Sequence, residues 1–85
     1  MNTIGHISWE VTQLINEYGD EIEMDIIQYP TEYQVTVNIC DKKPPFKDIT
    51  TTAIHPRSKR KAAKQAMMEL YKLAYPELFK IRSNK

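Results

Sequence analysis

The sequence predicts an α+β domain of element order α-β-β-β-α, in which two helices cover one face of a three-stranded antiparallel sheet. Three observations lead to this prediction: an apolar stripe at helical spacing near the N-terminus, three strand-like stretches in the middle, and a second helical stripe after Pro56. The 85 residues are 41% hydrophobic and 27% charged, which is typical of one small globular domain. We therefore expect a single domain over residues 1–85, with its core within 7–74 and a partly frayed extension at 75–85.

The first helix is expected to begin after Ser8, whose side chain can accept hydrogen bonds from the first backbone N–H groups. Gly19 would end it, because glycine readily adopts the left-handed conformation that closes a helix. Between them, apolar residues recur at i, i+3, i+4 and i+7, namely Val11, Leu14, Ile15 and Tyr18. This spacing predicts one buried helical face.

The three strands follow from alternation and composition. Apolar residues alternate with polar ones from Ile22 to Ile26 and again from Tyr33 to Ile39, and the segment 29–32 reads as a short turn between them. Residues 42–45 end the second strand, and the Thr- and Ile-rich segment from Phe46 to Ile54 predicts the third.

The second helix is expected to begin at Ser58, after Pro56 has ended the third strand, and to stop before Pro76. Its predicted apolar stripe is Ala63, Ala66, Met67, Leu70, Leu73 and Ala74. The predicted core of the domain comprises Val11, Leu14, Val35, Val37, Ala66, Met67 and Leu70.

Charge is distributed very unevenly along the chain. Residues 1–32 sum to −7, residues 33–55 to +1 and residues 56–85 to +7, although the whole chain carries only +1. Such polarity indicates a basic face that seeks phosphates or an acidic partner, and the alternative is that the two halves neutralise each other in the fold.

Four cations gather at the start of the second helix: Lys59, Arg60, Lys61 and Lys64. The N-terminus of a helix favours anions, so cations there cost helix stability by a few tenths of a kcal/mol each. Their position therefore indicates binding of a polyanion, and the alternative is a solvated lysine face that confers only solubility.

The segments 14–19 (LINEYG) and 60–66 (RKAAKQA), within the predicted element order, resemble the double-stranded RNA-binding domain family over residues 7–74. The resemblance implies a non-catalytic domain that contacts the backbone of double-stranded RNA through the start of the second helix. It also implies that Asn16 and Glu17 accept hydrogen bonds from 2′-hydroxyls, and Arg57 and His55 lie close enough in sequence to contact phosphate. The chain departs from the family in the short segment 29–32, which lacks the Gly-Pro-x-His loop and contains Glu32. We therefore expect weak RNA binding.

A second class of function fits the same fold, namely a protein-interaction or dimerisation module that pairs through the edge of the third strand. Residues 44–49 are faintly similar to the double-stranded RNA-binding-like domain of Dicer enzymes, and degenerate members of the family are associated with partner binding.

An enzyme is not expected. The carboxylates Glu17, Asp20, Glu21 and Glu23 do not obviously converge in the predicted fold, and the sequence has no glycine-rich phosphate loop and no metal-ligand spacing. We expect no cofactor, no metal and no membrane association. The single cysteine, Cys40, and the lack of a secretion pattern lead us to expect an intracellular location.

Overall fold

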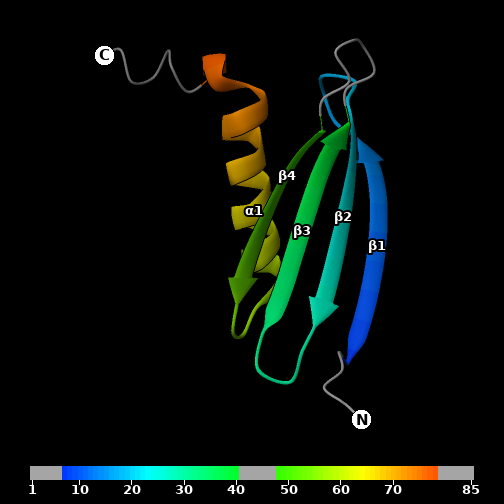
Figure 1. Cartoon of the computed structure of the whole chain (residues 1–85), viewed down its shortest axis with the longest axis vertical. Coiled ribbons are helices and arrows are strands. Elements are labelled where there is room, and N and C mark those ends of the chain that lie inside the picture. Colours follow the sequence, from blue (N-terminus) through cyan, green and yellow to red (C-terminus); the bar gives the residue numbers. More distant parts are fainter. Residues whose placement is uncertain (1–6, 41–47, 79–85) are drawn as a thin grey trace, which may run out of the picture.

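The computed structural model describes residues 7–40 and 48–78 and shows an α+β fold (Figure 1). Four strands, β1 (Ser8–Ile15), β2 (Glu21–Gln28), β3 (Tyr33–Cys40) and β4 (Asp48–His55), precede the helix α1 (Lys59–Ala74). The strands form one antiparallel sheet in the order β1-β2-β3-β4, so each strand pairs with its neighbour in the chain. No helix in the described residues is long and apolar enough to cross a membrane.

The first predicted helix is wrong, because residues 8–15 form the edge strand β1 and pair with β2 over its full length, from Ser8↔Gln28 to Ile15↔Glu21. The order is therefore β-β-β-β-α, with four strands in place of three. The stripe that predicted a helix contains residues three apart, and such residues point to opposite faces of a strand. Leu14 thus faces α1, whereas Val11 lies 51% exposed on the other face.

The turn after β1 also differs from the predicted helix end. Gly19 has φ of +84° within the β1–β2 turn, so it does adopt the left-handed conformation expected of it, but in a hairpin. The Asn16 side-chain oxygen accepts hydrogen bonds from the backbone N–H groups of Tyr18 and Asp20, at 2.9 and 3.0 Å. A short polar side chain that binds its own turn in this way competes with helix formation.

The alternation that predicted the next two strands is confirmed in β2 and β3. Ile22, Val35, Val37 and Ile39 are buried, and the segment 29–32 closes the hairpin between the strands. The third predicted strand is confirmed as β4, while its predicted start at Phe46 lies outside the described residues.

The second helix is confirmed as α1. Ser58 caps it by accepting the N–H of Lys61 at 3.1 Å, and the helix ends at Ala74, before Pro76. Residues 76–78 begin a further helical turn, and the rest of the predicted extension lies outside the described residues.

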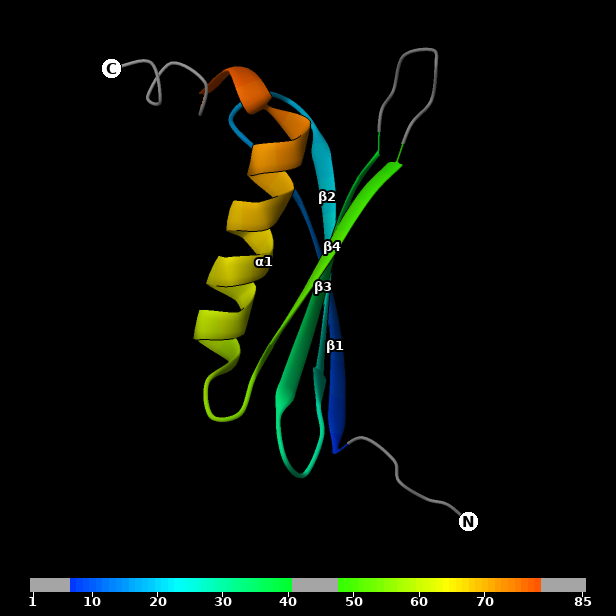
Figure 2. The same ribbon diagram turned by 60° about the vertical axis from the view of Figure 1, so that its left-hand side comes forward.

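The core lies between α1 and the β3–β4 half of the sheet, as Figure 2 shows from the side. Ala62, Ala66 and Leu70 are at most 1% exposed. Small alanines let the helix approach closely, and the Thr51 hydroxyl donates to the carbonyl of Ala66 at 2.7 Å. Leu73, predicted for the apolar stripe of this helix, is 59% exposed, and the buried stripe runs through Ala62, Ala66 and Leu70 instead.

Candidate nucleic-acid interface

The start of α1 is positioned by a compact set of backbone hydrogen bonds. His55 ends β4, and its Nδ1 accepts the N–H groups of Arg57 and Ser58, at 3.1 and 3.0 Å. Ser58 then caps the helix. His55 was predicted as a phosphate contact. Its Nδ1 instead accepts hydrogen bonds that hold the loop between β4 and α1 in place.

The exposed side of α1 carries a line of lysines. Lys61, Lys64 and Lys72 border a shallow hollow on the helix surface, together with Gln65, Met68 and Glu69. Lys61 and Lys72 are separated by eleven residues, about three helical turns or 16 Å of rise, so they share one side of the helix. Lys72 was not among the predicted site residues, although this spacing could have identified it.

Arg57 and Arg60 extend this line at the start of the helix. Both are exposed, and Arg60 lies four residues before Lys64, which makes the two side chains neighbours on the helix surface. The first turn of α1 contains no acidic residue. We refer to Arg57, Arg60, Lys61, Lys64 and Lys72 as the basic helix face.

Lys59, also predicted as a site residue, differs from the basic helix face because it forms an ion pair. Lys59 Nζ lies 3.1 Å from Glu10 Oε2 on β1, and both side chains are about half exposed. No ion pair within residues 7–40 and 48–78 involves a member of the basic helix face. Because Lys59 is already paired with Glu10, we expect its attraction to a phosphate to be weaker than that of the neighbouring cations.

Asn16 and Glu17, expected to contact ribose hydroxyls from a helix, lie instead in the β1–β2 turn. Asn16 Nδ2 donates to the hydroxyl oxygens of Tyr71 and Tyr75, at 3.2 and 2.8 Å, and the Tyr71 hydroxyl donates to Glu17 Oε1 at 3.5 Å. The turn is thereby tied to the end of α1. The structure does not bring these two residues together with the basic helix face, because they occupy the other end of the helix.

Three tyrosines complete this contact. The ring centroid of Tyr75 lies 4.6 Å from that of Tyr18 and 5.1 Å from that of Tyr71, distances at which aromatic pairs attract one another. The Tyr75 hydroxyl donates to Asp20 Oδ2 at 2.5 Å. Tyrosines engaged with each other and with the turn do not form a platform for stacking single-stranded bases.

The tyrosine cluster gives stability a defined dependence on alkaline pH. Burial, aided by the bond to Asp20, raises the pKa of Tyr75 to about 12, whereas an unfolded tyrosine titrates near 10. The unfolded chain therefore loses this proton first. We expect the contribution of Tyr75 to the free energy of unfolding to be constant below about pH 10 and to fall between pH 10 and about 12.

Thermal denaturation across this pH range measures the effect, and the variant Tyr75→Phe removes the titrating group. Burial also raises the pKa of Tyr71, so a smaller decline is expected to remain in the variant. Equal declines in the two proteins would contradict the role assigned to Tyr75.

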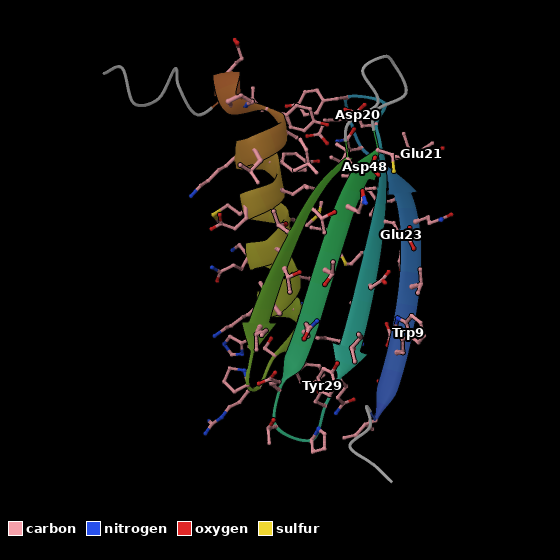
Figure 3. All side chains as sticks on the ribbon, viewed as in Figure 1. Trp9, Asp20, Glu21, Glu23, Tyr29 and Asp48 are labelled. Carbon is pink, nitrogen blue, oxygen red and sulfur yellow. The ribbon has the colours of Figure 1, made fainter. Side chains whose placement is uncertain are left out.

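Carboxylates gather at one end of the sheet. Figure 3 shows Asp20, Glu21 and Asp48 close together there, with Glu23 further along β2 and Trp9 toward the opposite end of β1. Cys40 ends β3 in this region and is exposed. Although the residue is exposed, partial desolvation of its sulfur, followed by the nearby carboxylate of Asp48, raises the pKa of its thiol, which disfavours the nucleophilic thiolate.

These carboxylates do not make a metal site. No three histidine, cysteine or carboxylate side chains in the described residues are grouped so that they could hold a metal ion. A pocket of about 320 Å³ opens beside them, lined by Gln13, Leu14, Ile15, Glu21, Ile22, Glu23 and Cys40.

The two charged regions therefore lie apart. The acidic end of the sheet adjoins the last turn of α1, whereas the helix starts at the other end of the molecule (Figures 1 and 3). The sequence also allowed the two charged halves to neutralise each other, and among the residues the structure describes the Lys59–Glu10 pair is such a contact.

We compared the chain with protein-family models, curated proteins and solved structures, and none matches significantly.

Proposed function

We propose that the protein binds the backbone of double-stranded RNA through the basic helix face of α1. The observation that carries this proposal is that four exposed cations on one side of α1, with exposed Arg57 just before the helix, make no ion pair with another described residue, although Glu69 borders the same hollow. The mutual repulsion of these cations costs stability, and so does the position of Arg60 and Lys61 in the first turn, near the positive end of the helix dipole. A ligand that supplies closely spaced negative charges removes both costs.

Duplex RNA fits this surface better than single strands do. The exposed side of α1 carries lysines, Gln65 and Met68, and the nearest aromatic residue, Tyr71, is engaged in the tyrosine cluster. A surface without stacking residues contacts backbone and not bases. The major groove of A-form RNA is too deep and narrow for base readout, and its phosphates offer charge to a row of lysines.

Binding is expected to be weak, because only one of the three contacts implied by the family resemblance has its residues in place. Asn16 and Glu17 are held in the β1–β2 turn by tyrosines. The β2–β3 turn is closed by hydrogen bonds between Tyr29 and Glu32, and the carboxylate of Glu32 would repel phosphate.

A titration of a perfect RNA duplex of about 20 base pairs, at low and at physiological salt, tests the proposal. Four or five phosphate contacts predict that affinity falls roughly 100- to 500-fold between 50 and 200 mM salt. Single-stranded RNA of the same length is the control and should bind more weakly. Salt-insensitive binding, or no binding to the duplex at any salt, would contradict the proposal.

The second candidate is a protein-interaction module. One observation favours it: β4, the strand predicted to pair with a partner, is an edge strand of the sheet. A partner added there would extend the sheet by main-chain hydrogen bonds. A stable hetero-complex or dimer that protects the β4 edge, without RNA affinity, would support this candidate.

A further inference from the structure

The opposite edge of the sheet, β1, is the more open of the two. Among described residues β1 pairs only with β2. The backbone of α1 packs against β4 and β3, and slightly against β2, whereas its described contact with β1 is the Lys59–Glu10 ion pair at the edge. Figures 1 and 2 show α1 running alongside β4 and away from β1. A helix beside an edge strand restricts access to it, so β4 is better protected than β1.

The pattern of hydrogen bonds between β1 and β2 shows which backbone groups of β1 face outward. Asn16 N–H donates to the Asp20 carbonyl at 3.0 Å, in the same register that pairs Leu14 with Ile22. Because bonded pairs alternate along an antiparallel ladder, the even-numbered residues of β1 bond to β2. The N–H and C=O groups of Trp9, Val11, Gln13 and Ile15 therefore point away from the sheet.

Strand β1 carries few of the features that usually prevent edge-to-edge pairing. Its sequence, SWEVTQLI, contains no lysine and no proline, and its single charged residue, Glu10, is paired with Lys59. An eight-residue edge of this kind is a template for another strand.

We propose that β1 pairs antiparallel with β1 of a second copy of this chain, about a two-fold axis that passes close to Thr12. Opposed residues must share a face of the combined sheet, and a register centred on Thr12 satisfies this condition. It places Trp9 opposite Ile15 of the second copy, twice, on the face away from α1. These side chains are 59% and 65% exposed in the single chain, and aromatic–β-branched cross-strand pairs are favourable.

Charge favours this contact over stacking of the two sheets. Stacking would bring the carboxylates of β2, among them Glu23 and Asp25, against those of the second copy. Edge pairing separates the two β2 strands by three strand spacings, about 14 Å. This distance exceeds the screening length of about 8 Å at physiological salt, so the repulsion is largely screened.

The dimer has a geometric consequence for α1. A two-fold axis perpendicular to the sheet keeps both helices on the same face, with six strand spacings, about 29 Å, between them. Two weak basic faces on one side of an eight-stranded sheet could bind one duplex with a gain in effective concentration. The pairing itself does not depend on RNA, so it can be tested without it.

Sedimentation equilibrium and amide hydrogen exchange, measured on the whole chain over a range of concentrations, test the proposal. We expect a dimer in which the amides of Val11 and Gln13 gain protection as concentration rises. The outward amides of the other edge, at Thr50 and Thr52, should not change. A monomer at all concentrations, or protection of Thr50 and Thr52 instead, would overturn the proposal.

A pair of matched variants localises the contact. Val11→Pro removes an outward N–H that makes no bond to β2, and proline is tolerated on edge strands, so the fold should remain while the dimer is lost. Thr52→Pro is the control, because Thr52 lies in the same cross-strand row on β4 and also points its N–H outward. Should either proline variant fail to fold, Val11→Lys and Thr52→Lys make the same comparison. A folded Val11 variant that stays dimeric would overturn the assignment.

Discussion

Reversing the charge of both Lys61 and Lys64 to glutamate is expected to reduce affinity for duplex RNA by at least about 100-fold. The change removes two phosphate contacts from the basic helix face and adds two carboxylates that repel the backbone. Both lysines are exposed, and neither makes an ion pair with another described residue. Titration at fixed salt measures the loss.

The fold should survive this reversal. Lys61 is the third residue of α1, and its N–H already bonds to the Ser58 side chain. Glutamate at this position completes a capping box and places a negative charge near the positive end of the helix dipole. We therefore expect the free energy of unfolding to stay the same or rise slightly, which separates lost binding from lost structure.

Single replacements make the assignment residue by residue. Lys61→Ala and Lys64→Ala should each lower the slope of log affinity against log salt by about one contact, for all duplex sequences alike. Lys59→Ala is the matched control and should have a smaller effect, because Lys59 is engaged with Glu10. If the double reversal left the affinity for duplex RNA unchanged, the RNA-binding proposal would be contradicted and the protein-interaction candidate would be favoured.

Replacement of Leu70 by alanine is expected to lower the free energy of unfolding by about 2–5 kcal/mol. Leu70 is 0% exposed and is one of the largest fully buried side chains, packed in the core formed by α1 and the sheet. Truncation removes buried apolar area and leaves a cavity. For a domain of this size, the loss is a large share of a total stability of about 5–15 kcal/mol.

Leu73 on the same helix provides the control. It is 59% exposed, so Leu73→Ala should change stability by no more than about 0.5 kcal/mol. Urea denaturation of both variants, extrapolated to water, measures the difference. Equal losses would indicate that the helix is rotated relative to the sheet from the orientation described here.

The sequence predicted the secondary structure correctly where apolar residues follow a single clear periodicity. Alternation from Ile22 to Ile26 and from Tyr33 to Ile39 is compatible only with half-buried strands, and both were confirmed. The end of β4 and the start of α1 followed from Pro56 and the Ser58 cap, which act locally. Arg60, Lys61 and Lys64 were likewise identified from the sequence, because they lie close together along one helix, whereas Lys72, near the other end of α1, was missed.

The sequence by itself determined the α+β class, the identity of β2, β3 and α1, and the polarity of charge along the chain. Only the tertiary structure decided that residues 8–15 form a strand, because their apolar spacing fits a helix as well and the choice depends on pairing with β2. Long-range contacts also engage Asn16 and Glu17 with tyrosines and Lys59 with Glu10, all partners at least 49 residues away. Such partners cannot be inferred from local pattern, since which side chains meet depends on how the sheet is assembled.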